Sequence, residues 1–114
     1  MKAKLNYNGR EIIIEDIIEY SGMMKLVGLM FARRERARAL LFNFSSAKIR
    51  AIHSFFVFFP FVAVWLSDGK IVEIQAVMPF LPSVKPKKPF DQLVEIPLNN
   101  SYKEVTDFLV ERKV

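Results

Sequence analysis

Cysteine is absent from the 114-residue chain, and histidine occurs only once, as His53. The lack of cysteine excludes disulfides, thiolate zinc sites, iron–sulfur clusters and cysteine nucleophiles. One histidine cannot build a multi-histidine metal site within a single chain. We therefore expect no metal and no cofactor, and no arrangement of carboxylates, lysines or hydroxyls in the sequence indicates a reaction.

Long apolar segments are also missing. Residues 51–67 contain no Asp, Glu, Lys or Arg, but this stretch is shorter than the roughly 20 residues of a spanning helix. Pro60 interrupts it near its centre. The N-terminal residues carry charges where a secretory signal needs an apolar segment. These features predict a cytoplasmic protein without a membrane span.

The composition favours one folded domain over residues 1–114. A chain of this length fits a single compact domain. Hydrophobic residues make up 52% and charged residues 25% of the chain, a balance that supports a core and argues against intrinsic disorder.

Positive charge is concentrated in two short segments. The net charge is +5, and the excess lies in residues 33–50 and 85–88. Such segments could bind the phosphates of a nucleic acid or an acidic protein surface, and the simpler interpretation is a solvated basic loop. The basic residues are Arg33, Arg34, Arg36, Arg38, Lys48 and Arg50 in the first segment and Lys85, Lys87 and Lys88 in the second.

Phenylalanine is abundant, with 11 copies, and many of them lie close together in the middle of the chain. An exposed group of this density would favour aggregation, so we expect its members in the hydrophobic core. The alternative is an aromatic platform on which nucleic acid bases stack. The residues concerned are Phe55, Phe56, Phe58, Phe59, Phe61 and Trp65.

The pattern of apolar and turn residues predicts several strands. Asn8 and Gly9 separate residues 2–7 from residues 11–16, and Asn-Gly predicts a β-hairpin because both residues accept positive φ angles. Four prolines and three lysines in residues 78–89 predict a loop there. Further strands are predicted over residues 39–44, 52–59, 61–66, 70–77 and 92–96.

Two helices are predicted. Apolar side chains at helical spacing indicate a short helix over residues 23–30, capped by Ser21. Ser101 and Glu104 fit a capping box that opens a C-terminal helix. Together these elements predict an α+β domain, built on a small, mainly antiparallel sheet or barrel of about seven strands with two short helices.

Catalytic motifs are weak. His53 and Ser54 could form a hydrolytic group with a carboxylate such as Glu73 or Asp68, but no nucleophile elbow surrounds Ser54. We expect His53 to be a structural residue that makes a hydrogen bond to the backbone or to a polar neighbour.

Five motifs in consecutive order resemble a known family. They are Val27-Gly28-Leu29-Met30-Phe31, Leu40-Leu41-Phe42-Asn43-Phe44, Ile52-His53-Ser54-Phe55-Phe56-Val57-Phe58-Phe59-Pro60, Asp68-Gly69-Lys70-Ile71-Val72 and Leu93-Val94-Glu95-Ile96. The pattern resembles the uncharacterised family called domain of unknown function 192, in particular its archaeal branch, and covers about residues 20–97. The family has no established activity, so the resemblance implies a fold and no reaction.

The chain departs from bacterial members of that family. The aromatic strand of many bacterial relatives carries a Trp-Met-Lys-Asn-Thr-like stretch, and an aspartate lies two residues after the proline. Alignment on Pro60 places apolar Val62 at the aspartate position. Glu95 is the family-like acidic position that remains.

We therefore expect a small cytoplasmic, non-enzymatic binding or interaction domain. The alternative is nucleic-acid binding through residues 33–50 and 85–88. A hydrolase that uses His53 and Glu95 is the least favoured interpretation.

Overall fold

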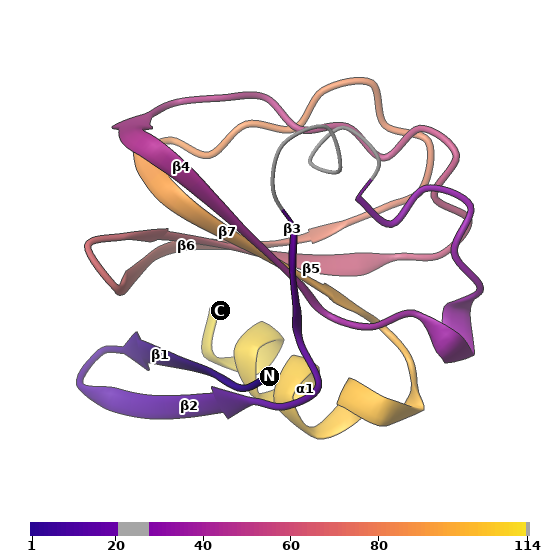
Figure 1. Cartoon of the computed structure of the whole chain (residues 1–114), viewed down its shortest axis with the longest axis horizontal. Helices are drawn as coiled ribbons and strands as arrows, with labels where there is room; N and C mark the ends of the chain where they lie inside the picture. The colour runs from indigo at the N-terminus through magenta and orange to yellow at the C-terminus, as the bar shows by residue number, and fades with distance from the viewer. Residues whose placement is uncertain (21–27, 114) are drawn as a thin grey trace.

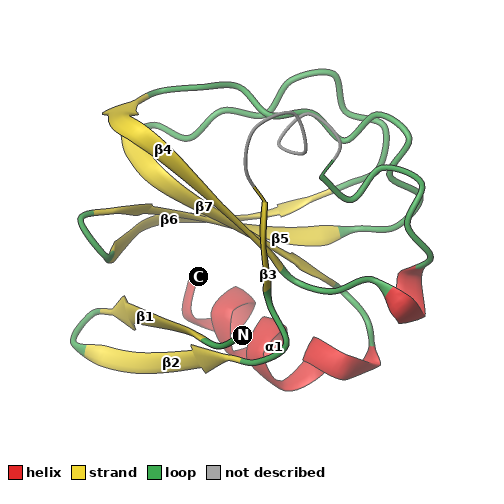
Figure 2. Cartoon of the chain, viewed as in Figure 1, coloured by secondary structure: helices red, strands yellow, loops and turns green. Residues whose placement is uncertain are grey.

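The computed structural model describes residues 1–20 and 28–113, and seven strands within them form one curled, mixed sheet (Figures 1 and 2). The strand order is β2-β1-β6-β5-β7-β4-β3. The strands are β1 (Ala3–Tyr7), β2 (Arg10–Ile14), β3 (Ile18–Tyr20), β4 (Leu40–Lys48), β5 (Phe61–Ser67), β6 (Lys70–Val77) and β7 (Phe90–Pro97). The helical elements among the described residues are the 3-10 turns η2 (Arg34–Arg36) and η3 (Asn100–Tyr102) and the helix α1 (Lys103–Lys113).

The predicted N-terminal hairpin is confirmed. Strands β1 and β2 pair antiparallel, and the turn between them has positive φ angles at Asn8 (53°) and Gly9 (82°). The Asn6 side chain accepts a hydrogen bond from the Gly9 amide at 3.0 Å and stabilises the turn. The hairpin joins the sheet where β1 runs parallel to β6.

Strand β5 lies at the centre of the sheet and is buried on both faces. It pairs antiparallel with β6 on one side and with β7 on the other. The strand is a continuous apolar run from Phe61 to Leu66, as expected of burial on both faces, because a strand with one solvated face alternates polar and apolar residues.

The hairpin β1–β2 and the helix α1 cover one face of the central strands (Figure 1). The buried Tyr102 hydroxyl, just before α1, accepts a hydrogen bond from the Ala39 amide and donates one to the Asp16 carbonyl, both at 2.9 Å. Burial raises the pKa of Tyr102 above its ordinary value. These bonds fix the start of the helix against β4.

The predicted C-terminal helix is present, but its cap differs from the predicted one. The Asn99 side chain accepts a hydrogen bond from the Ser101 amide at 3.1 Å, so Asn99 caps η3, which leads into α1. The same side chain donates to the carbonyls of Arg34 and Ala37. Asn99 is therefore held by contacts distant in sequence, which the capping box at Ser101 did not reveal.

Three loop segments cover the other face of the sheet: residues 28–39, 49–60 and 78–89 (Figure 2). The strand predicted over residues 52–59 is wrong, because its only pairing is an isolated bridge between Ile52 and Val84. The loop predicted over residues 78–89 is confirmed.

One strand was not predicted, and one predicted helix lies mostly outside the described residues. The strand β3 was not predicted, and it pairs parallel with β4, so the sheet is mixed and not purely antiparallel. Most of the helix predicted over residues 23–30 lies outside the described residues, and residues 28–31 form a turn.

The prediction that the clustered phenylalanines belong to the core is half right. Phe59 (2% exposed), Phe61 and Trp65 are buried. Phe55, Phe56 and Phe58 are exposed. Because residues 53–58 form a loop and not a strand, their side chains do not alternate between two faces of a sheet.

No helix in the described part of the chain has the length and apolar character needed to cross a membrane.

Truncation of the neighbouring residues Phe58 and Phe59 should change stability by very different amounts. We expect Phe59→Ala to lower the free energy of unfolding by about 3–5 kcal/mol, because it leaves a cavity in the core. Phe58→Ala should change it by less than about 1 kcal/mol, because that ring is largely in solvent. Urea denaturation of both variants measures the difference. Equal losses at the two positions would contradict the assignment of Phe58 to the surface.

Candidate functional site

Four phenylalanine rings meet on the surface of the loop layer. Phe31, Phe56, Phe58 and Phe80 are between 48% and 66% exposed. Phe31 stacks on Phe56 with ring centroids 5.2 Å apart and touches Phe58 at 6.5 Å. Phe58 meets the edge of Phe80 at 5.2 Å. We call these four residues the aromatic surface.

Three members of the aromatic surface have a left-handed backbone. The φ angles are 60° at Phe31, 59° at Phe56 and 62° at Phe80. A side chain with a Cβ atom rarely adopts this conformation, which costs about 1–2 kcal/mol per residue. Strained residues of this kind cluster at functional sites, where the surrounding structure holds them in place.

Ser54 holds the loops of the aromatic surface together. Its hydroxyl donates to the Met78 carbonyl at 2.6 Å and accepts from the Leu81 amide at 2.7 Å. Its backbone carbonyl accepts from the amides of Phe80 and Val57, and its own amide donates to the Leu81 carbonyl. Because Ser54 is fully buried and its hydroxyl is occupied, the structure gives it a structural role and not that of a nucleophile.

A direct hydrogen bond joins the loop that contains Phe31 to the loop that contains Phe56. The Phe31 amide donates to the Phe56 carbonyl at 2.8 Å, beneath the stacked rings of the same two residues. The aromatic surface is therefore tied together through its backbone as well as through its rings.

The loop segments that carry the aromatic surface have more basic than acidic residues. Segments 49–60 and 78–89 contain no Asp or Glu, and segment 28–39 contains Glu35. The basic residues of the three segments are Arg33, Arg34, Arg36, Arg38, Arg50, Lys85, Lys87 and Lys88.

Several of the predicted basic residues have structural contacts. Arg34 donates to the Leu98 carbonyl at 2.7 Å, and Arg38 pairs with Asp16 at 2.7 Å. Arg50 donates to the carbonyls of Phe90 and Ser46. A surface that binds phosphates needs free cationic groups. These contacts therefore reduce the number of arginine side chains that are available to bind phosphates.

The basic residues of the two segments lie near both ends of β7. Arg34 contacts Leu98, just after the end of β7, whereas Lys85, Lys87 and Lys88 precede the start of that strand. An eight-residue strand such as β7 spans about 25 Å. Lys48 pairs with Phe90 and Arg50 donates to the Phe90 carbonyl, so these two residues lie at the same end of β7 as the lysines, and Arg34 lies near the other end.

A second feature is a cavity of about 220 Å³ beneath the loop layer, which we call the Glu95 cavity. Glu95, from β7, is 6% exposed. Gly28 permits its close approach, because a Cβ atom at Gly28 would lie 3.2 Å from the Glu95 Oε1 atom. His53 and Arg50 also line the cavity.

Burial changes the chemistry of Glu95. Desolvation raises the pKa of its carboxyl from the ordinary 4.5 to about 8. Within residues 1–20 and 28–113, no hydrogen bond or salt bridge to this carboxyl offsets the effect. The structure thus brings the predicted pair His53 and Glu95 to one cavity, while the His53 Nδ1 atom accepts a hydrogen bond from the Phe55 amide at 3.2 Å.

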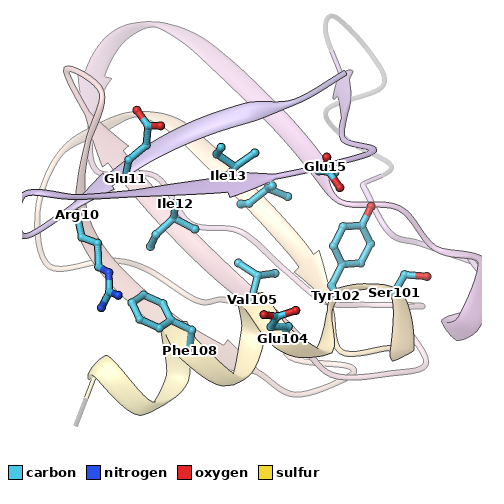
Figure 3. Close-up of a pocket in the computed structure, with 11 residues that line it drawn as sticks. Arg10, Glu11, Ile12, Ile13, Glu15, Ser101, Tyr102, Glu104, Val105 and Phe108 are labelled. Atoms are coloured by element: carbon cyan, nitrogen blue, oxygen red, sulfur yellow. The ribbon is translucent and has the colours of Figure 1, made fainter.

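A third feature is a groove of about 500 Å³ between β2 and α1. Figure 3 shows Arg10 reaching from β2 toward Phe108 of α1, where its guanidinium lies 5.2 Å from the ring centroid. Ile12 and Val105 also line the groove, as part of the core that joins the hairpin to the helix. We interpret this groove as packing between the two elements.

Sequence reasoning found Glu95 but missed the exposure of the aromatic surface. The phenylalanines of residues 55–59 gave no periodicity that could separate buried from exposed positions. Phe31 and Phe80 are distant from them in sequence, so only the folded loops bring the four rings together.

The left-handed backbone of Phe56 predicts the effect of two substitutions. Phe56→Gly and Phe56→Ala both remove the ring, but only alanine keeps a Cβ atom in the strained conformation. We expect the glycine variant to be more stable by about 0.5–1 kcal/mol in urea denaturation. At Phe58, which has no positive φ, alanine should be the more stable of the same pair. If the alanine variant is more stable than the glycine variant at both positions, the backbone strain at Phe56 is contradicted.

The raised pKa of Glu95 predicts a pH dependence of stability. The folded chain holds this proton more tightly than the unfolded chain, so the contribution of Glu95 to stability is greatest below pH 4.5 and is lost as the pH rises to about 8. The slope from this group is about 1.4 kcal/mol per pH unit. Denaturation of the parent and of Glu95→Gln between pH 5 and 8 isolates this contribution. Parallel curves for the two proteins would contradict the assignment.

Two solved structures share the fold. A Sinorhizobium meliloti 1021 protein, described as a candidate transcription regulator, has a TM-score of 0.69 at 18% identity, over 90% of this chain and 82% of that chain. A protein of unknown function from Novosphingobium aromaticivorans DSM 12444 has a TM-score of 0.69 at 12% identity, over 92% of this chain and 77% of that chain. At these identities the likeness concerns the fold alone. No curated protein matches the chain.

A family match covers most of the chain. The family described as "DUF192: Uncharacterized ACR" matches residues 18–104, from β3 to the start of α1. The match includes the aromatic surface and Glu95, and it leaves out the hairpin β1–β2. The resemblance noted in the sequence is thereby confirmed at the level of the family, and the chain belongs to the DUF192 family.

Proposed function

We propose that this chain is a protein-interaction domain whose aromatic surface binds an apolar segment with acidic flanks on a partner protein. The observation that supports the proposal is the group of four exposed phenylalanine rings, held in contact by strained loops. The proposal gives the expected binding or interaction module a definite surface.

The size of the aromatic surface fits the centre of an interface. Four phenylalanines with about half of their surface exposed present roughly 400 Å² of apolar area. Exposed patches of this size on monomers often have a function. A standard interface buries about 800 Å² on each partner, and aromatic residues near its centre supply most of the binding free energy.

The charge of the surrounding loops selects the partner. The loop segments 28–39, 49–60 and 78–89 carry eight basic side chains and one acidic side chain, Glu35. Acidic groups on a partner would complement this charge and increase the association rate. Two copies of this chain that met face to face would repel each other, so the charge favours a different, acidic partner.

Nucleic-acid binding through residues 33–50 and 85–88 remains the second candidate. The excess of basic over acidic residues in the loops supports it, and the Sinorhizobium protein with the same fold is described as a candidate transcription regulator. Two observations favour a protein partner. The rings pack against one another, which leaves fewer open faces for bases, and Arg34 lies near the opposite end of β7 from Lys85, Lys87 and Lys88.

The absence of catalysis, the cytoplasmic location and membership of the archaeal branch stay predictions. Any of them could fail without affecting the aromatic surface as an interaction site.

Peptide selection tests the proposal. A random peptide library, selected on the immobilised chain, should enrich peptides that combine large apolar residues with Asp or Glu. Fluorescence anisotropy should then show that the double variant Phe31→Ser, Phe58→Ser raises the Kd of such a peptide at least tenfold, or about 1.4 kcal/mol. The control Ile13→Ser removes an exposed apolar side chain from β2 and should leave the Kd unchanged.

Three outcomes would contradict the proposal. The first is a library that yields no enriched peptide, and the second is a double variant that binds the peptides as well as the parent does. The third is tighter binding of single-stranded oligonucleotides or anionic lipid vesicles than of any peptide, with loss of that binding in the double variant. Circular dichroism of each variant confirms that it is folded.

A further inference from the structure

The Glu95 cavity combines one buried acid with aromatic and aliphatic walls. Glu95 lies next to Leu40 on β4 and Ala63 on β5, so two neighbouring strands fix its position. Phe42, Phe90 and Leu93 belong to the cavity wall. We infer that this cavity binds a small organic amine, with the ammonium group at Glu95 and the apolar part of the molecule against the aromatic walls.

The Glu95 carboxyl is open to a hydrogen-bond donor on a ligand. Desolvation alone raises its pKa, with no compensating hydrogen bond or charge from the described residues. Its oxygen atoms are not among the fully buried side-chain atoms without a partner, which are Trp65 Nε1 and Asp91 Oδ1, and the cavity gives a ligand access to the carboxyl. A protonated amine supplies both hydrogen-bond donors and the charge that a buried carboxylate needs.

The walls of the cavity suit an aromatic or aliphatic amine. The Phe42 ring lies near Glu95, since a Cβ atom at Gly28 would meet both side chains, and a ring close to an ammonium group stabilises the charge through cation–π interactions. Phe44 and Phe90 also line the cavity, and their rings contact the Arg50 guanidinium. The volume of about 220 Å³ exceeds the roughly 150 Å³ of an apolar cavity that accommodates benzene. A molecule such as benzylamine therefore fits in size.

The other charged groups of the cavity do not replace Glu95 as the recognition point. Arg50 donates to the carbonyls of Phe90 and Ser46 and lies 4.4 Å from the centroid of the Phe44 ring. Its partner Phe90 is five residues from Glu95 along β7, or about 16 Å at the rise of a strand. His53 is the other titratable residue in the described lining, and its Nδ1 atom already accepts a hydrogen bond.

The test compares three ligands of similar size on the parent chain. Benzylamine, benzyl alcohol and benzoate are titrated separately, and binding is followed by NMR shifts of Leu93 and of the cavity phenylalanines. We expect benzylamine to bind at least tenfold more tightly than the other two. Its affinity should rise with pH up to about 8, because the ammonium group binds the ionised form of Glu95.

Variants locate the site. Glu95→Gln should weaken benzylamine at least tenfold and leave benzyl alcohol unchanged, whereas Glu104→Gln, which alters an acid on α1, should change neither. Preference for benzyl alcohol or benzoate in the parent, equal binding of benzylamine to Glu95→Gln, or no binding of any ligand would overturn the inference. The ligand comparison needs no variant, so it decides the question even if Glu95→Gln fails to fold. None of these results depends on the peptides that test the aromatic surface.

Discussion

The burial of β5 on both faces is the constraint on which the rest of the structure depends. Every residue from Phe61 to Leu66 is buried, so each face of the sheet needs its own apolar cover. Helix α1 and the hairpin β1–β2 supply one cover. Over the other face, the described residues supply a cover of loops and the short 3-10 turn η2.

A cover made of loops raises a problem that a helix does not have. Loop backbone groups find no regular partners, and a buried group without a hydrogen bond costs free energy. Ser54 provides partners for several of these backbone groups. Its hydroxyl, amide and carbonyl form hydrogen bonds between the two loops that contain Phe56 and Phe80. The bridge between Ile52 and Val84 continues the same connection. Loop packing is nevertheless incomplete, and the Glu95 cavity remains beneath it.

Local signals predicted the regular elements, and contacts distant in sequence decided the rest. Asn8-Gly9 specified the hairpin because two adjacent residues fix the turn. Glu95 was identified as a candidate from the family pattern, but its place in a cavity depends on Gly28, which is far from it in sequence. Phe58 and Phe59 are chemically identical neighbours, and only the loop conformation separates the exposed ring from the buried one.

The aromatic surface is difficult to explain as a product of folding alone. Glycine or asparagine would adopt the left-handed conformation of Phe31, Phe56 and Phe80 at lower cost. A polar side chain at each position would also remove the exposed apolar area, which favours aggregation. The buried contacts of β5 and of the loop layer beneath can offset these costs, but they do not require phenylalanine at the surface. Binding to an apolar partner would give the exposed rings a role that folding does not.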